Sequence, residues 1–273
     1  MDFNNIYNMF KKYVKNHGDK WRYKQITYEP EDITSEEELY KCMHSMIKDY
    51  DEHSSLLIVG NTIANQKVKS KNLKPDIHFK DKIGKMVLHP FIAKKENAQN
   101  EQNEIIKLIY ETIDKWTGLN MKKLILDLRH FTGGSYIPYV IGLQKIIGER
   151  TLYGLKQENG KIEWINLIDG NIKSSNKLIN NVNKQKLQIR VLINENTKSA
   201  GEFLALMFKG QHNCKQIGLN TGGLLSFNKT IKMNSKIILL LTKGNIIDTN
   251  RNECTFIKPD VIKTDPLEYS KIN

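Results

Sequence analysis

The stretch that most constrains the fold is residues 187–208, where a buried strand passes almost directly into a helix. The mostly apolar run from Ile189 to Ile193 has the length and the β-branched content of a buried strand. A short polar turn follows, and from Ala200 apolar residues recur at helical spacing. Strands that alternate with helices in this way predict an α/β fold.

Ser199 lies at the junction between this turn and the helix. A serine in that position exposes its hydroxyl where backbone N–H groups converge, which is the arrangement of a nucleophile. The position also suits an ordinary helix N-cap, because serine is a preferred capping residue and Glu202 stands at capping-box spacing. Both interpretations stay open on this stretch alone, and one serine can serve in both.

The remaining sequence predicts three parts. Residues 1–60 are expected to form an N-terminal helical subdomain that ends in the His53 segment, and residues 61–82 a linker or connecting loop. Residues 83–273 are expected to form the α/β core domain. The expected core elements are strands at 83–88, 124–128, 151–154, 161–164, 189–193 and 237–241, and helices over 94–118, from Pro138 and from Ala200.

Two loops in the core are rich in glycine. Gly133 and Gly134 follow the buried strand at 124–128, and a second loop contains Thr221, Gly222 and Gly223. Glycines at such places allow backbone N–H groups to approach a ligand or a transient oxyanion. A tight turn would use paired glycines equally well.

His53 lies where the second predicted helix ends and the chain turns toward a short apolar run. A single histidine in that place is typical of a surface or helix-terminal residue. The neighbouring Asp51 and Glu52 would raise the basicity of the imidazole if they packed against it.

The charge and the cysteines bound the function classes. A net charge of +12 raises nucleic acid or an anionic surface as a partner. The lysines are scattered among asparagines, however, and the densest cluster, Lys67–Lys74, is expected in a solvated loop, so nucleic-acid binding is not favoured. The three cysteines have no CxxC spacing, so we expect thiols rather than a zinc site or a disulfide framework.

The sequence contains no apolar run of about 18 residues, so no membrane span is expected. The N-terminus lacks the apolar core of a signal peptide. The chain as written is therefore expected in the cytoplasm, or outside it if a leader has been removed. The sequence does not indicate the oligomeric state.

Five segments in one order resemble the C-terminal processing (tail-specific) serine peptidases, the clan that includes the tricorn protease core. They are Asp51–Ser54, Leu126–Arg129 with Gly133–Gly134, Val191–Glu202, Ile217–Gly223 and Ile257–Asp260. Leu224 stands where the serine–lysine branch of the family has its lysine, and no PDZ domain fits between His53 and the strand at 83–88. The chain is thus more similar to the histidine-using branch, with the tricorn-like cores and the short nisin-resistance-type peptidases.

The sequence departs from the family pattern at three positions. Phe131 stands at an asparagine position, Glu52 at a glycine position and Gly201 at the position of a commoner small residue.

The resemblance implies a ClpP/crotonase-like α/β core of the β-β-α superhelix type. It implies a serine endopeptidase that cleaves peptides or unfolded proteins near the C-terminus, with neither a metal nor an organic cofactor. The residues it assigns are the nucleophile Ser199, the general base His53, the oxyanion hole of Ala200, Gly133 and Gly134, and the supporting residues Glu202 and Glu253. The alternatives are a catalytically idle relative that binds peptides and, less favoured, a basic nucleic-acid-binding protein.

Overall fold

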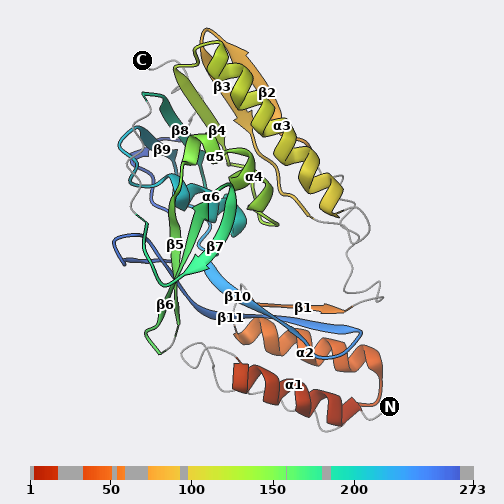
Figure 1. The fold of residues 1–273 in the computed structure, drawn as a ribbon. Helices are drawn as coiled ribbons and strands as arrows, with labels where there is room; N and C mark the ends of the chain where they lie inside the picture. The colour runs from red at the N-terminus through yellow and green to blue at the C-terminus, as the bar shows by residue number, and fades with distance from the viewer. Residues whose placement is uncertain are drawn as a thin grey trace. The chain divides into compact units, whose positions relative to one another are not determined.

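The computed structural model describes residues 3–17, 33–50, 54–58, 73–92, 98–157, 159–179 and 186–264 (Figure 1). The chain divides into two compact units, which are described separately. The first unit comprises residues 1–69, 156–161 and 226–245, and the second comprises residues 70–155, 162–225 and 246–273. Residues 226–245, which the sequence suggested as part of the core domain, thus cluster with the N-terminal helices.

The first unit combines two helices with an antiparallel sheet. Its elements are α1 (Phe3–His17), α2 (Glu36–Tyr50), β1 (Ser55–Ile58), β10 (Ser226–Lys232) and most of β11 (Ile237–Ile247). Both β1 and β10 pair with β11. The apolar faces of the two helices supply Phe10, Val14 and Met43 to a core that also contains Leu239 and Leu241 of β11.

Hydrogen bonds from side chains cap the N-terminus of α2. The carboxylate of Glu38 accepts hydrogen bonds from the backbone N–H and the hydroxyl of Thr34, at 3.0 and 2.9 Å. In return, the Glu38 N–H donates to the hydroxyl of Ser35 at 3.2 Å. These bonds satisfy backbone donors that the first helical turn leaves without an intrahelical partner.

The second unit is built on a six-stranded sheet in the order β13-β9-β8-β4-β3-β2. The strands from β3 to β13 run parallel to their neighbours, and β2 is antiparallel to β3. The strands are β2 (Asp76–Lys80), β3 (Ile83–Val87), β4 (Lys123–Asp127), β8 (Gln188–Ile193), β9 (Cys214–Gly218) and β13 (Val261–Ile262). Every residue of β4 is buried, including Lys123 and Asp127 at its two ends, and the apolar residues between them predict a buried strand.

Helices cover this sheet. The helices of the second unit are α3 (Ala98–Gly118), α4 (Ile137–Gly142), α5 (Gln144–Ile147) and α6 (Ala200–Phe208). Trp116 of α3 stacks on Phe79 of β2, with ring centroids 5.5 Å apart. Its ring also occupies the space where a side chain on Gly84 of β3 would lie, which explains the glycine there. All nine residues of α6 are buried, including Glu202.

Four further strands lie outside the six-stranded sheet. They are β5 (Arg150–Gln157), β6 (Ile162–Ile168), β7 (Asn171–Ser175) and the short β12 (Glu253–Cys254). The antiparallel pair of β6 and β7 is joined at the predicted turn, where Asp169 and Gly170 have φ values of 50° and 70°. Two residues with positive φ are the requirement of a tight hairpin.

The alternation of strands and helices predicted from the sequence is confirmed, and the structure adds several elements, among them β2 and β10. Residues 76–80, expected within a connecting loop, form the edge strand β2, whose residues alternate between exposed and half-buried. Strand β10 was not predicted, because its polar residues Asn228, Lys229 and Thr230 obscure an apolar pattern. Among the helices in the described ranges, none has the length and apolar character needed to cross a membrane.

Candidate active site

Three loops of the second unit follow adjacent parallel strands. Residues 128–136 follow β4, residues 194–199 follow β8, and residues 219–225 follow β9. The carboxyl ends of parallel strands lie at the same edge of a sheet, which is the usual location of a ligand site in such folds. Gly133, Gly134 and Ser199 belong to these loops, and Glu202 lies in the first turn of α6.

Ser199 adopts a backbone conformation that L-residues rarely occupy. Its φ is 49° and its ψ is −114°, and it connects the turn after β8 to the first residue of α6. A non-glycine residue in such a region costs on the order of 1–3 kcal/mol and persists only where its surroundings hold it. A sharp, strained turn from strand to helix is also the geometry that exposes a nucleophilic serine in other α/β enzymes.

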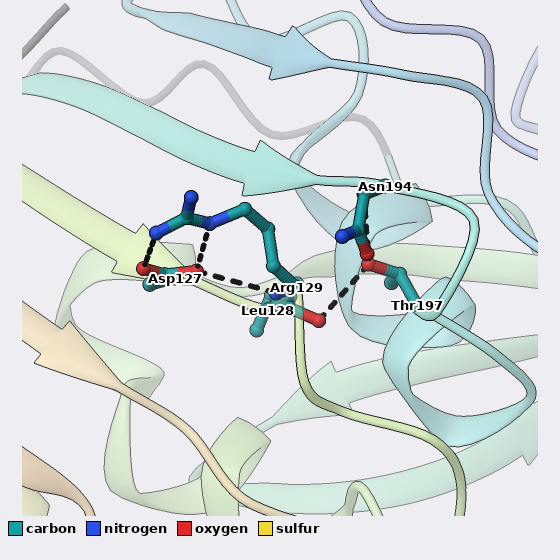
Figure 2. A network of polar contacts seen from close by, with 5 residues as sticks. All are labelled: Asp127, Leu128, Arg129, Asn194 and Thr197. Atoms are coloured by element: carbon teal, nitrogen blue, oxygen red, sulfur yellow. Dashed lines mark hydrogen bonds and ion pairs between the residues drawn. The ribbon is translucent and has the colours of Figure 1, made fainter. Parts of the chain in front are cut away.

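The turn before Ser199 is bonded to the loop after β4 (Figure 2). The hydroxyl of Thr197 donates to the carbonyl of Leu128 at 2.9 Å and accepts from the N–H of Asn194 at 3.1 Å. The N–H of Lys198 donates to the carbonyl of Phe131 at 3.0 Å. These bonds fix the serine turn relative to the first glycine loop.

An ion pair stiffens the start of that loop (Figure 2). The guanidinium of Arg129 donates to both carboxylate oxygens of Asp127, at 2.8 and 2.6 Å. The N–H of Arg129 donates to the same carboxylate at 3.3 Å. Asp127 is buried, so a bidentate pair is the arrangement that compensates its charge. This carboxylate therefore serves the loop rather than proton transfer.

The paired glycines are required by their surroundings. Gly133 and Gly134 have φ values of 146° and 91°. A Cβ at Gly134 would lie 2.6 Å from the carbonyl oxygen of Phe91, which accepts a hydrogen bond from Ser135. A Cβ at Gly133 would lie 3.9 Å from the Cβ of Ser199. The backbone of Gly133 thus runs directly beside the serine side chain.

Two departures from the family motif are neighbours in the fold. A Cβ at Gly201 would lie 2.4 Å from the carbonyl oxygen of Phe131 and 3.1 Å from its Cβ. The ring of Phe131 is fully buried and packs edge-on against Tyr139, with centroids 5.2 Å apart. Glycine at position 201 therefore lets the first turn of α6 approach the loop that carries Phe131.

Glu202 is a buried carboxylate that accepts four hydrogen bonds. Its Oε2 accepts from the N–H groups of Ser199 and Leu224, at 2.9 and 2.7 Å. Its Oε1 accepts from the hydroxyl of Thr221 at 2.6 Å and from the N–H of Gly223 at 2.9 Å. Burial raises the pKa of this carboxyl above its ordinary value of 4.5, and the four hydrogen bonds act in the opposite direction.

The second glycine loop is held against the serine turn. The N–H of Gly222 donates to the carbonyl of Thr197 at 2.9 Å, and a Cβ at Gly222 would collide with the side chain of Lys198. Thr221 in turn exchanges hydrogen bonds with Ile257: its hydroxyl accepts from the Ile257 N–H at 2.7 Å, and its N–H donates to the Ile257 carbonyl at 3.1 Å. The closing motif at 257–260 thereby supports the loop.

Aromatic side chains also join the first glycine loop to α6. Tyr136, the last residue of that loop, stacks on Phe203 of α6 with centroids 5.3 Å apart. Phe203 contacts Tyr153 at 4.9 Å, and the hydroxyls of the two tyrosines lie 2.5 Å apart. Burial raises the pKa of Tyr153 well above its ordinary value. These rings pack the elements that carry the site, and their phenols stay protonated.

The structure brings Ser199, Ala200, Gly133, Gly134 and Glu202 together. His53 and its neighbours Asp51 and Glu52 lie outside the described residues, so the distance between His53 and Ser199 remains a prediction. Glu253 is exposed on β12 and pairs with Ile247 of β11.

Sequence reasoning gave no role to Thr197, Thr221 and Arg129, although all three lie within the quoted motifs. Thr197 and Thr221 bond to segments far away in the chain, whereas Arg129 pairs with Asp127 of the preceding strand. Among the described residues, no group of three or more His, Cys, Asp or Glu side chains is arranged to hold a metal ion.

Comparisons with known proteins show the family and the fold of the chain. The model of peptidase family S41 matches residues 82–262. The chain is 28% identical over 211 residues to the nisin-resistance protein of Lactococcus lactis subsp. lactis, which covers 74% of this chain and 64% of that protein. The chain thus spans less than two thirds of that relative.

Solved structures show the same fold. A lipoprotein from Streptococcus agalactiae superposes with a TM-score of 0.79 at 22% identity, over 99% of this chain and 95% of the other. A candidate S41 protease from Bacteroides fragilis gives a TM-score of 0.51 at 17% identity, over 72% of this chain and 51% of that one.

The family match includes four of the five segments that carried the resemblance, and the fold class expected from it is confirmed. The match covers well over half of the chain. We conclude that this protein belongs to peptidase family S41, a family of proteases.

Proposed function

We propose that this protein is a serine endopeptidase with Ser199 as the nucleophile and His53 as the general base. The observation that supports the proposal most strongly is the backbone of Ser199, whose φ of 49° places it in a strained turn between strand and helix. A serine that only caps a helix has ordinary β-region dihedrals, so capping alone does not explain the strained backbone of Ser199. The cap role nevertheless accompanies the proposed one, because Glu202 binds the Ser199 N–H.

The backbone around Ser199 supplies donors for an oxyanion. The N–H groups of Ala200, Gly133 and Gly134 form no hydrogen bond with another described residue. Gly133 lies beside Ser199, and Ala200 begins the helix whose N-terminus favours negative charge. We assign the oxyanion hole to the Ala200 N–H together with an N–H from Gly133 or Gly134. Loss of one such donor typically raises the barrier by about 3–4 kcal/mol.

The proposed reaction has two halves. His53 takes the proton of the Ser199 hydroxyl as the oxygen attacks the peptide carbonyl, and then gives that proton to the leaving amine. Water, activated by the same imidazole, hydrolyses the resulting acyl-enzyme and restores the serine. Glu202 holds the Ser199 turn through the backbone, and we retain Glu253 as a proposed acidic support for His53.

The proposed substrate is a peptide or an unfolded protein cleaved near its C-terminus. The net charge of +12 would attract acidic or carboxylate-bearing ends. One relative is a nisin-resistance protein and one structural neighbour is a lipoprotein. We therefore propose that the protein acts outside the cytoplasm, although its N-terminus alone suggested a location in the cytoplasm.

Mass spectrometry of the products from a peptide library tests this function. We expect the wild-type protein to cleave peptides, with cuts concentrated near their C-termini, and Ser199→Ala to cleave none. Ser174→Ala, which removes an exposed hydroxyl from β7, is the matched control and should behave as wild type. A wild-type protein that binds peptides and leaves them intact would instead identify a catalytically idle relative.

A further inference from the structure

A pocket of about 540 Å³ opens in the second unit, away from the proposed catalytic centre. Its lining includes Lys122, which directly precedes β4, and Lys186 and Leu187, which directly precede β8. Ser199 and the glycine loops follow the opposite ends of these strands. The pocket therefore lies at the amino-terminal edge of the parallel sheet and cannot be part of the site described above.

The charge around this pocket is unbalanced. Three lysines line it, Lys122, Lys145 and Lys186, against one carboxylate, that of Asp114. Lys145 is already paired: its ammonium binds Asp114 and lies 4.3 Å from the centroid of the Tyr110 ring. Lys122 and Lys186 form no ion pair with any residue in the described ranges, and both are exposed. Two positive charges in the pocket lining thus have no counter-charge among the residues that the structure describes.

The pocket lining also contains three apolar residues, beside the polar Thr117 and Asn120. Met121 and Ile146 contribute side chains that are 8% and 2% exposed, and Leu187 is half-buried beside them. A volume of about 540 Å³ falls within the range of small-molecule sites. Apolar side chains beside two ammonium groups that no described carboxylate pairs with are complementary to a molecule with an apolar body and one anionic end.

We propose that this pocket binds a small amphiphilic anion, an alkyl chain that ends in a carboxylate or a phosphate. The chain rests on Met121, Ile146 and Leu187, and the anionic group lies between the ammonium groups of Lys122 and Lys186. This inference does not depend on Ser199 or on the proposed peptidase reaction.

The experiment is a titration of the full-length protein with hexanoate and with hexyl phosphate. Calorimetry measures the affinity, and the methyl signal of Met121 in protein with ¹³C-methyl-labelled methionine reports the location. We expect saturable binding of at least one probe, with a shift of the Met121 signal. Acetate should bind at least tenfold more weakly, because it lacks the methylenes that the apolar side chains would bury. Hexanol should also bind more weakly, because it lacks the charge.

Substitutions distinguish binding in this pocket from a general attraction of anions to a basic protein. Lys122→Gln and Lys186→Gln should each weaken binding by about two- to fivefold, as expected for a partly exposed ion pair, and the double variant by about tenfold. Lys229→Gln, an exposed lysine of the first unit, is the matched control and should leave the affinity unchanged. Equal affinity in the double variant and the wild type, or no saturable binding of either probe, would overturn the proposal.

Discussion

The carboxylate of Glu202 accepts a hydrogen bond from the backbone N–H of Ser199 at 2.9 Å. The same side chain accepts three further hydrogen bonds from Thr221, Gly223 and Leu224. One buried residue therefore connects the serine turn to the second glycine loop. The strained backbone of Ser199 depends on such connections, since a residue in that conformation is held by its neighbours.

Glu202→Gln should lower both stability and activity. The amide would turn an NH₂ group toward backbone donors, so that two of the four hydrogen bonds are lost and buried N–H groups stay unsatisfied. Each such group costs about 1–3 kcal/mol, and we expect a loss of about 2–4 kcal/mol in the free energy of unfolding. Urea denaturation measures it. Glu111→Gln, on the exposed face of α3, is the control and should change the free energy by less than about 0.5 kcal/mol. Equal stability of both variants would show that Glu202 is not a structural link.

The pKa of Glu202 gives a second, pH-dependent prediction. Burial raises this pKa above 4.5, so the folded protein binds a proton at Glu202 more tightly than the unfolded chain does. Stability from this group is therefore present at low pH and is lost as the pH rises through the folded pKa. Glu202→Gln cannot titrate, so the stability difference between wild type and variant should shrink as the pH rises above 4.5. A difference that grows over this range would show that the pKa is lowered instead.

The backbone conformation of Ser199 predicts which of two inactive variants is the more stable. Glycine tolerates a φ of 49° without strain, whereas alanine does not. Ser199→Gly should therefore be more stable than Ser199→Ala by about 1 kcal/mol, and both should lack peptidase activity. Thermal unfolding of the pair measures this difference. If alanine proves the more stable of the two, the strain at position 199 has been misjudged.

Gly201→Ala should destabilise the site. Its Cβ would lie 2.4 Å from the Phe131 carbonyl, which already accepts a hydrogen bond from Lys198. We expect a loss of about 1–3 kcal/mol, typical of overpacking in a buried position, together with lower activity. Gly118→Ala has no atom within 4 Å of the new Cβ and serves as the control. Full stability in Gly201→Ala would mean that α6 moves away from the loop at little cost.

Tyr50 and Ser54, which stand before and after the His53 segment in the sequence, belong to one polar network of the first unit. The hydroxyl of Tyr50 donates to the carbonyl of Thr242 at 3.2 Å, and the N–H of Thr242 donates to the hydroxyl of Ser54 at 3.1 Å. Removal of either hydroxyl should misplace the proposed base. Tyr50→Phe and Ser54→Ala are expected to lower kcat by about tenfold with little change in KM, because small misplacements of catalytic groups are costly.

Steady-state kinetics on a peptide substrate measures these effects, with Tyr110→Phe of α3 as the control. If KM rises while kcat is unchanged, the network supports substrate binding instead of the base.

Much of the fold follows from local sequence patterns. The strands at 123–127 and 188–193 contain short runs of mostly apolar residues, and the helix over 98–118 shows clear periodicity, so each could be predicted alone. Ser199, Gly133 and Gly134 could be predicted because strand ends and glycine pairs are local signals. Edge strand β2 could not, because alternating half-buried residues in a polar stretch also suit a loop.

The contacts that hold the site required the structure. The approach of Gly201 to Phe131 joins residues 70 positions apart, and no local pattern encodes it. Glu202 was expected as a capping residue, and its bond to Ser199 fits that expectation. Its bonds to Gly223 and Leu224 depend on where the loop after β9 lies in space, which the sequence near Glu202 does not reveal.

The most direct test of the central claim is to map the site of reaction with a fluorophosphonate, which phosphonylates activated serines. Native protein is labelled, digested and sequenced by mass spectrometry, beside heat-denatured protein and Ser199→Ala. We predict a single phosphonyl group on Ser199 in the native protein and no labelling in the two controls. Labelling of a different serine, or peptide cleavage that persists in Ser199→Ala, would contradict the assignment of Ser199 as the nucleophile.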